Sequence, residues 1–95
     1  MKNPVLSRSP EQSEGVSERF VFFDLETQRS FQEVGGRHNI RHLGLSVAVT
    51  YSTADGAYHH YTEETVDDLI GELKTADLVV GFNVINFDYE VLRPY

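Results

Sequence analysis

The pattern of apolar and polar positions predicts three strands before residue 62. Residues 20–23, Phe-Val-Phe-Phe, form a short apolar run typical of a strand that is buried on both faces. Residues 42–52 alternate apolar with small or polar side chains, which indicates a longer strand. Residues 54–57, Ala-Asp-Gly-Ala, predict a hairpin turn because Asp-Gly tolerates positive φ, so residues 58–61 should form an antiparallel third strand. The intervening residues 27–41 contain two adjacent glycines and predict an irregular loop.

A helical period replaces this pattern from Thr62, which is placed to cap a helix. The apolar side chains that follow fall at i, i+3, i+4 and i+7, one stripe of an amphipathic helix; they are Val66, Leu69, Ile70 and Leu73. Residues 77–81 then predict a short buried strand. Asn83 predicts the cap of a second helix, which should turn Val84, Phe87 and Val91 inward.

Three strands, a helix, a strand and a helix predict an α/β fold with a mixed sheet. Crossover connections are right-handed, so the fourth strand should return beside the first strand and parallel to it. We therefore expect the order 3-2-1-4, with strands 1–3 antiparallel and helices after strands 3 and 4. Residues 1–18, rich in Ser, Glu and Pro, predict a flexible N-terminal tail, and residues 19–95 predict one domain.

Composition narrows the class of protein. The 95 residues are 40% hydrophobic and 24% charged, as in ordinary globular proteins, and the formal net charge is -7. That charge argues against binding nucleic acid by broad phosphate neutralisation, unless acids gather around divalent ions that reverse the local sign. The absence of cysteine excludes zinc-thiolate sites and disulfides. No apolar run has membrane-spanning length and no signal-peptide pattern opens the chain, so we expect a cytoplasmic protein without a membrane partner.

Three acids stand out as candidate metal ligands. Asp24 and Glu26 follow the first apolar run, and side chains at i and i+2 of a strand share one face. Asp88 lies in the second helix, after the strand expected beside the first. Ligands of open α/β sheets bind at the carboxyl ends of adjacent strands, so the three carboxylates should meet there and suit Mg²⁺ or Mn²⁺. Phe87 should anchor its helix in the core while Asp88 points to the cleft, and Asn83 is expected to be structural.

Two segments resemble the motifs of a known superfamily. Residues 23–27, Phe-Asp-Leu-Glu-Thr, resemble the first motif of the DEDD (DnaQ-like) 3′–5′ exonucleases, which have a ribonuclease H-like fold. Residues 81–88, Gly-Phe-Asn-Val-Ile-Asn-Phe-Asp, are similar to the second motif, above all as it occurs in the exonuclease domain of family B DNA polymerases. The resemblance covers roughly residues 20–92.

The resemblance implies a nuclease that hydrolyses phosphodiesters of DNA or RNA with two Mg²⁺ or Mn²⁺ ions. Asp24 would bridge both ions, Glu26 would hold the ion that binds the attacking water, and Asp88 would help to hold the other. Thr27 would line the pocket for the terminal nucleotide, and Asn86 would face the substrate strand. The implied partner is the 3′ end of a single-stranded nucleic acid.

The chain departs from the family pattern in its third motif, a His or Tyr three residues ahead of a final Asp, which does not occur before Tyr95. Residues 19–95 are therefore expected to be the N-terminal part of a ribonuclease H-like exonuclease domain, incomplete at its C-terminus and by itself almost inactive. The alternatives are a catalytically inactive nucleic-acid- or partner-binding module with the same fold, and a purely structural domain.

Other polar and aromatic residues favour structural roles. His38 and His42 are expected on a loop surface, whereas His59 and His60 alternate faces of a strand and cannot both face one metal. Four aromatic residues could stack on bases, but cross-strand packing is the favoured interpretation; they are Phe31, Tyr51, Tyr58 and Tyr61. The acidic cluster Glu63, Glu64, Asp67 and Asp68 predicts a solvated helix start.

The fourth predicted strand, residues 77–81, also bears on whether the chain associates with itself. If no strand lies outside residues 77–81, that apolar strand is an uncovered edge, and such edges pair with other chains. We therefore expect self-association through the fourth strand.

Overall fold

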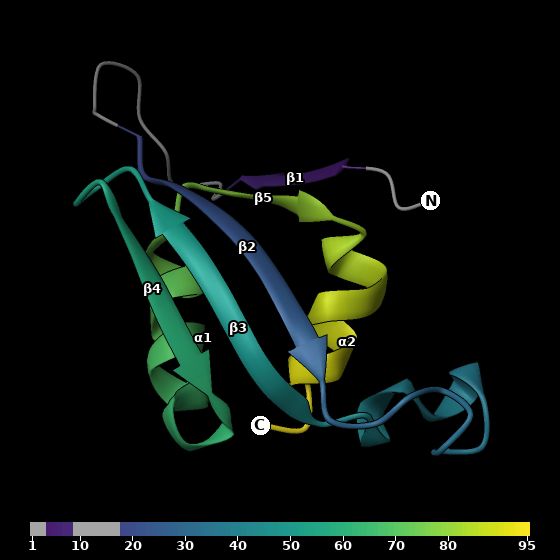
Figure 1. Cartoon of the computed structure of the whole chain (residues 1–95). Helices are drawn as coiled ribbons and strands as arrows, with labels where there is room; N and C mark the ends of the chain where they lie inside the picture. Colours follow the sequence, from purple (N-terminus) through teal and green to yellow (C-terminus); the bar gives the residue numbers. More distant parts are fainter. Residues whose placement is uncertain (1–3, 9–17) are drawn as a thin grey trace.

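The computed structural model describes residues 4–8 and 18–95, which form a five-stranded mixed sheet with two helices (Figure 1). Its strands are β1 (Pro4–Arg8), β2 (Phe20–Thr27), β3 (Leu45–Ser52), β4 (Ala57–Thr62) and β5 (Leu78–Phe82). They lie in the order β1-β5-β2-β3-β4. β2 is antiparallel to β3 and parallel to β5, and β3 is antiparallel to β4. The predicted order 3-2-1-4 and its strand directions are thus confirmed for β2 to β5.

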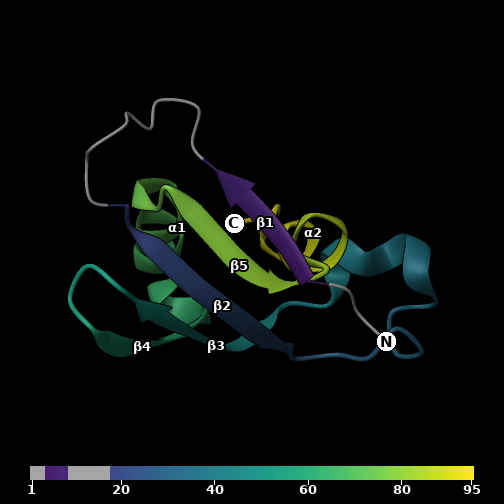
Figure 2. The same cartoon turned by 90° about the horizontal axis from the view of Figure 1, so that it is seen from above.

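Both helices follow strands, as predicted. Helix α1 (Val66–Thr75) is reached from β4 through a 3₁₀ turn at Glu63–Thr65, and the backbone N–H of Thr62 donates to the Thr65 hydroxyl over 3.0 Å. Helix α2 (Tyr89–Leu92) is reached from β5 through a π-helical turn at Val84–Asp88. Figures 1 and 2 show both helices on the same side of the sheet.

The core lies between the helices and this one face of the sheet. Every second residue of β2 is buried there, while its neighbours in sequence are exposed on the opposite face. The largest side chains that are fully buried come from β2, from β3 and the residues before it, and from the helical segments; the apolar ones are Val21, Leu43, Leu45, Leu69, Val84 and Val91. The strand that was expected to be buried on both faces therefore has one open face.

Residues 28–44 connect β2 to β3, where an irregular loop was predicted. Their only regular element is a short 3₁₀ helix at Arg37–His42, and both His38 and His42 are exposed, as expected. The loop closes on itself next to the sheet, because the backbone N–H of Gln28 donates to the carbonyl of Gly44 over 2.9 Å. It lies at the C-terminal end of β2 (Figure 1).

The prediction of a flexible tail at residues 1–18 is wrong for Pro4–Arg8. These residues form β1, which runs antiparallel to β5 on its outer side, with Leu6 opposite Val80 (Figure 2). The outer edge of β5 is therefore covered by the same chain, and the uncovered edge on which self-association was predicted does not exist. Residues 1–3 and 9–17 of the expected tail lie outside the described residues.

Candidate functional site

The two acids of the first motif share the open face of β2. Val21, Phe23 and Leu25 are each at most 5% exposed, whereas Asp24 and Glu26 are exposed. This alternation confirms that the two carboxylates leave the strand on the same side. A shift in the pairing of β2 with β3 follows at once, between Glu26 and Thr27. The acids thus end the regular part of the strand, on the face without helices.

The second motif begins where β5 runs beside β2. The two strands pair in parallel, with Phe20 opposite Leu78 and Phe22 opposite Val80. Gly81 follows, and a Cβ at this position would lie 2.7 Å from the carbonyl oxygen of Phe23, which is shorter than any ordinary contact. Only glycine allows the backbone of the second motif to approach the residue before Asp24 so closely.

The chain leaves β5 through an unusual backbone conformation. Asn83 is left-handed, with φ 53° and ψ 37°, and it is the one non-glycine residue with positive φ in the part of the chain that the structure describes. Its carbonyl accepts from the N–H of Phe87 over 2.9 Å, and Val84–Asp88 then form the π-helical turn. Asn83 therefore precedes the second helix as predicted, but its side chain makes no capping hydrogen bond. Single π turns and left-handed residues are concentrated at functional sites.

The π turn buries Asp88 even more fully than its neighbour Phe87. Asp88 is only 1% exposed, while Phe87 is half-buried and meets Phe31 edge to face, with ring centroids 6.0 Å apart. We expected Phe87 to anchor the helix in the core and Asp88 to be open to a cleft; Phe87 does pack against the core, whereas Asp88 is buried. A π turn holds one residue more than an α turn, so it advances the following side chains around the axis and brings Asp88 into the interior.

The three acids are therefore only partly brought together. Asp24 and Glu26 are neighbours on the open face, and Asp88 is buried after the adjacent strand. Within residues 4–8 and 18–95, no three His, Asp or Glu side chains are grouped closely enough to hold a metal ion. The carboxylates have the chemistry that Mg²⁺ or Mn²⁺ prefers, but their present arrangement is not a complete metal centre.

The two residues expected to contact substrate differ in their surroundings. The hydroxyl of Thr27 donates to the carbonyl of Arg29 over 2.7 Å, which fixes the first turn of the loop after β2. Asn86 lies in the π turn of the second motif, and its side chain is exposed.

A shallow pocket of about 790 Å³ lies on the open face of the sheet beside Asp24. Aromatic side chains from four strands line it: Phe22, Tyr51, Tyr58 and Phe82. Tyr51 packs against its cross-strand neighbours, with ring centroids 6.3 Å from Phe22 and 4.9 Å from Tyr58. The predicted cross-strand packing of Tyr51 and Tyr58 is confirmed, although Tyr58 remains 70% exposed.

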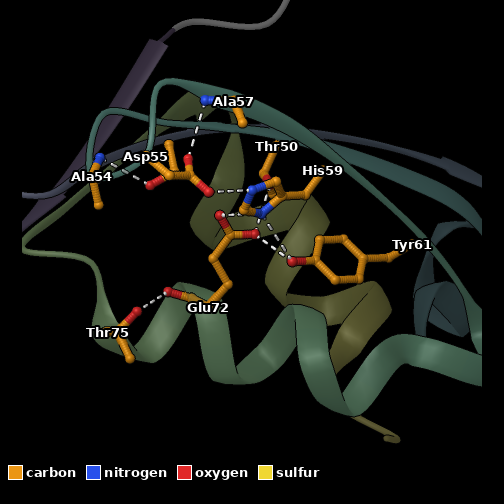
Figure 3. A network of polar contacts seen from close by, with 9 residues as sticks. Thr50, Ala54, Asp55, Ala57, His59, Tyr61, Glu72 and Thr75 are labelled. Carbon is orange, nitrogen blue, oxygen red and sulfur yellow. Dashed lines mark hydrogen bonds and ion pairs between the residues drawn. The ribbon is translucent and has the colours of Figure 1, made fainter.

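A second polar cluster lies on the covered face, between β4 and α1 (Figure 3), and the sequence interpretation missed it. Tyr61 donates there to Glu72 over 2.7 Å, and the ring of His59 lies between Glu72 and Asp55. His60 is exposed on the opposite face, as the predicted alternation requires. A signal was available, because Glu72 follows Leu69 by three residues and so belongs to the inward side of the helix.

Within residues 4–8 and 18–95, no helix combines the length and the apolar character that crossing a bilayer requires. Comparisons with protein-family models, with curated proteins and with solved structures found no match.

Proposed function

We propose that this chain forms part of a divalent-metal-dependent 3′–5′ exonuclease, in which Asp24, Glu26 and Asp88 are the metal ligands contributed by these residues. The ions would be Mg²⁺ or Mn²⁺, and the substrate would be the 3′ end of a single-stranded nucleic acid. Two such ions stabilise the entering and the leaving oxygen of a phosphodiester when carboxylates hold them close together.

The observation that carries the proposal is the parallel pairing of β2 with β5. The two segments that resemble exonuclease motifs end neighbouring parallel strands, and their carboxyl ends are where α/β sheets bind ligands. Asp24 and Glu26 face one side there. The close approach of Gly81 to Phe23 and the left-handed Asn83 add support, because both are local constraints inside the second motif.

The burial of Asp88 favours one alternative, a nucleic-acid- or partner-binding module that has the same fold without turnover. Asp88 is only 1% exposed, whereas a ligand of an ion on the open face must be accessible from that face. In the alternative, Asp88 keeps its buried position whether or not metal is present.

Metal binding is the direct test. Mn²⁺ broadens the NMR signals of nearby nuclei, so titration of the ¹⁵N-labelled chain should first broaden the amides around Asp24 and Glu26, and then those of the second motif. Asp24→Asn and Glu26→Gln should each weaken this binding by about tenfold or more, since even outer-shell partners of a metal are worth 10–100-fold. Asp67→Asn, which removes an exposed acid from the start of α1, is the matched control and should bind as the unchanged chain does.

Two outcomes separate the functions. Binding of a 3′-labelled single strand that requires Mn²⁺ and is lost in Asp24→Asn supports the exonuclease, although residues 19–95 alone should release few mononucleotides. Binding of the same strand without release, unchanged in Asp24→Asn, supports the binding module. Broadening centred on His38, His42 or Glu63–Asp68 contradicts the metal site itself.

A further inference from the structure

The imidazole of His59 lies between two carboxylates that come from different parts of the fold (Figure 3). On one side, Nε2 is 2.7 Å from Oδ2 of Asp55, in the turn between β3 and β4. On the other side, Nδ1 is 3.2 Å from Oε2 of Glu72, on α1. The other oxygen of Asp55 accepts from the backbone N–H of Ala57 over 3.1 Å, which ties this carboxylate to the hairpin. His59 thus joins the tip of the hairpin to the helix.

Glu72 depends on His59 for one of its two oxygens. Oε1 accepts from the hydroxyls of Thr50 and Tyr61, each over 2.7 Å. Oε2 is buried, and Nδ1 of His59 lies 3.2 Å from it, so the ring of His59 is its counter-charge there. A buried carboxylate oxygen without compensation is costly, because burial removes its hydration.

Only the doubly protonated ring satisfies both neighbours. Imidazolium has two N–H donors, whereas neutral imidazole has one donor and one acceptor. Deprotonation would leave a nitrogen lone pair facing either Asp55 or Glu72. Tyr61 cannot fill that gap, although its hydroxyl is 3.4 Å from Nδ1 of His59, because its proton is donated to Glu72. Burial raises the pKa of Tyr61 and keeps that proton in place at neutral pH.

The charges around the ring all favour the protonated form. The turn supplies Asp55 and α1 supplies Glu72, with Asp68 also on α1 and close enough to act on Tyr61. The buried residue that β3 contributes is Thr50, which does not ionise in this range. The hydrogen bond to Asp55 raises the pKa of His59 above its ordinary value of 6.5, the charge of Glu72 adds to this rise, and partial burial opposes it.

We propose that protonated His59 is a pH-dependent clamp that holds the tip of the β3–β4 hairpin to helix α1. Because the pKa of His59 is higher in the folded chain than in the unfolded chain, the clamp is complete below pH 6.5 and is lost as the pH rises through the folded pKa. For each unit by which the folded pKa of His59 exceeds the unfolded pKa, the unfolding equilibrium constant differs tenfold between low pH and high pH. Above the folded pKa, the hydrogen bond from Tyr61 to Glu72 still joins β4, an edge strand of the sheet, to α1.

The clamp is tested on the full chain by NMR titration of its four histidines and by urea unfolding at pH 6 and pH 8.5. The midpoint of His59 should lie above 6.5, and the signal that shows it should be missing in His59→Gln. The unchanged chain should lose stability between the two pH values, and His59→Gln should lose less. His60→Gln is the matched control, since it removes the exposed neighbour on the other face and should behave as the unchanged chain does.

Asp55→Asn keeps the test decisive if His59→Gln does not fold, because Asp55 is exposed at the turn and its loss leaves Glu72 in place. In this variant the midpoint of His59 should fall while the protein remains folded. The proposal is overturned if the midpoint of His59 does not exceed 6.5, if His59→Gln loses as much stability between the two pH values as the unchanged chain does, or if Asp55→Asn leaves the midpoint of His59 unmoved.

Discussion

Gly81 packs directly against the peptide group of Phe23, with no room for a side chain between β5 and β2. A Cβ on Gly81 would also lie 2.7 Å from Cγ2 of Val84, the first residue of the π turn. Neither contact can be relieved cheaply, because one is to backbone and the other is to a buried β-branched side chain. The junction between the two candidate motifs is therefore set by the size of one residue.

Replacing this glycine should separate the two strands. Gly81→Ala is expected to destabilise the fold by about 1–3 kcal/mol, the usual cost of overpacking a filled site. Urea unfolding gives the value. Gly71→Ala is the matched control, since a Cβ at Gly71 meets nothing within 4 Å on the exposed side of α1, and it should stabilise the chain by roughly 0.5–1 kcal/mol. Equal effects of the two substitutions would show that Gly81 is not sterically constrained.

The left-handed conformation at Asn83 gives a second prediction. Asn83→Gly should keep the turn, because glycine adopts positive φ readily, whereas Asn83→Ala should cost about 1–2 kcal/mol more. The comparison removes the side chain in both variants and so isolates the backbone. Unfolding free energies measured in urea will distinguish them. If alanine is tolerated as well as glycine, the left-handed turn at this position is not required for folding.

Strand β1 protects the outer edge of β5, so its removal should promote association. A chain that begins at residue 9 would expose the N–H and C=O groups of Leu78–Phe82 that now pair with Pro4–Arg8. We expect the shortened chain to form dimers or larger species in sedimentation experiments at concentrations where the full chain does not. If the unshortened chain associates to the same extent, the contact between chains does not involve β5. The next candidate is then β4, at the opposite edge of the sheet.

Tyr95 provides a prediction in acid. Its hydroxyl donates to Glu63 and accepts from the backbone N–H of Leu45 over 2.9 Å. The first of these bonds lowers the pKa of Glu63, so its contribution to stability is present above the ordinary value of 4.5 and is lost as the pH falls through the lower folded value. Tyr95→Phe should therefore be less stable than the unchanged chain at pH 6.5, and the difference should narrow at pH 3. If the difference in unfolding free energy between Tyr95→Phe and the unchanged chain is the same at both pH values, it comes from the hydrogen bond with the backbone N–H of Leu45 and not from Glu63.

The central sheet was predictable because its determinants are local and directional. Alternation in residues 42–52, the Asp55-Gly56 turn and the helical stripe after Thr62 each specify one element. The handedness of the crossover then leaves a single place for β5 beside β2. The same logic placed Asp24 and Glu26 on one face, because a two-residue period leaves no other choice for a strand.

The remaining features depend on tertiary contacts that no short pattern encodes. β1 comes from a segment rich in Ser and Pro, and it is a strand because β5 offers it an edge. Asp88 was misplaced because Val84, Phe87 and Val91 have ordinary helical spacing, and that spacing gives no sign of the extra residue in the π turn. The contact between Glu72 and His59 could not be predicted, because it depends on how closely α1 packs against β4 in the folded structure.

The alternation along β2 ties the integrity of the candidate site to that of the whole molecule. Deletion of Val21 or Phe22 would turn both acids toward the helices and expose Phe23 and Leu25, because a shift of one residue reverses every side chain of a strand. Such a shift of the strand register should not yield a folded protein with a damaged site, because it disrupts the core at the same time. Gene variants with single-codon losses in this strand should therefore appear as missing protein, whereas those that exchange Asp24 or Glu26 should leave normal amounts of an altered one.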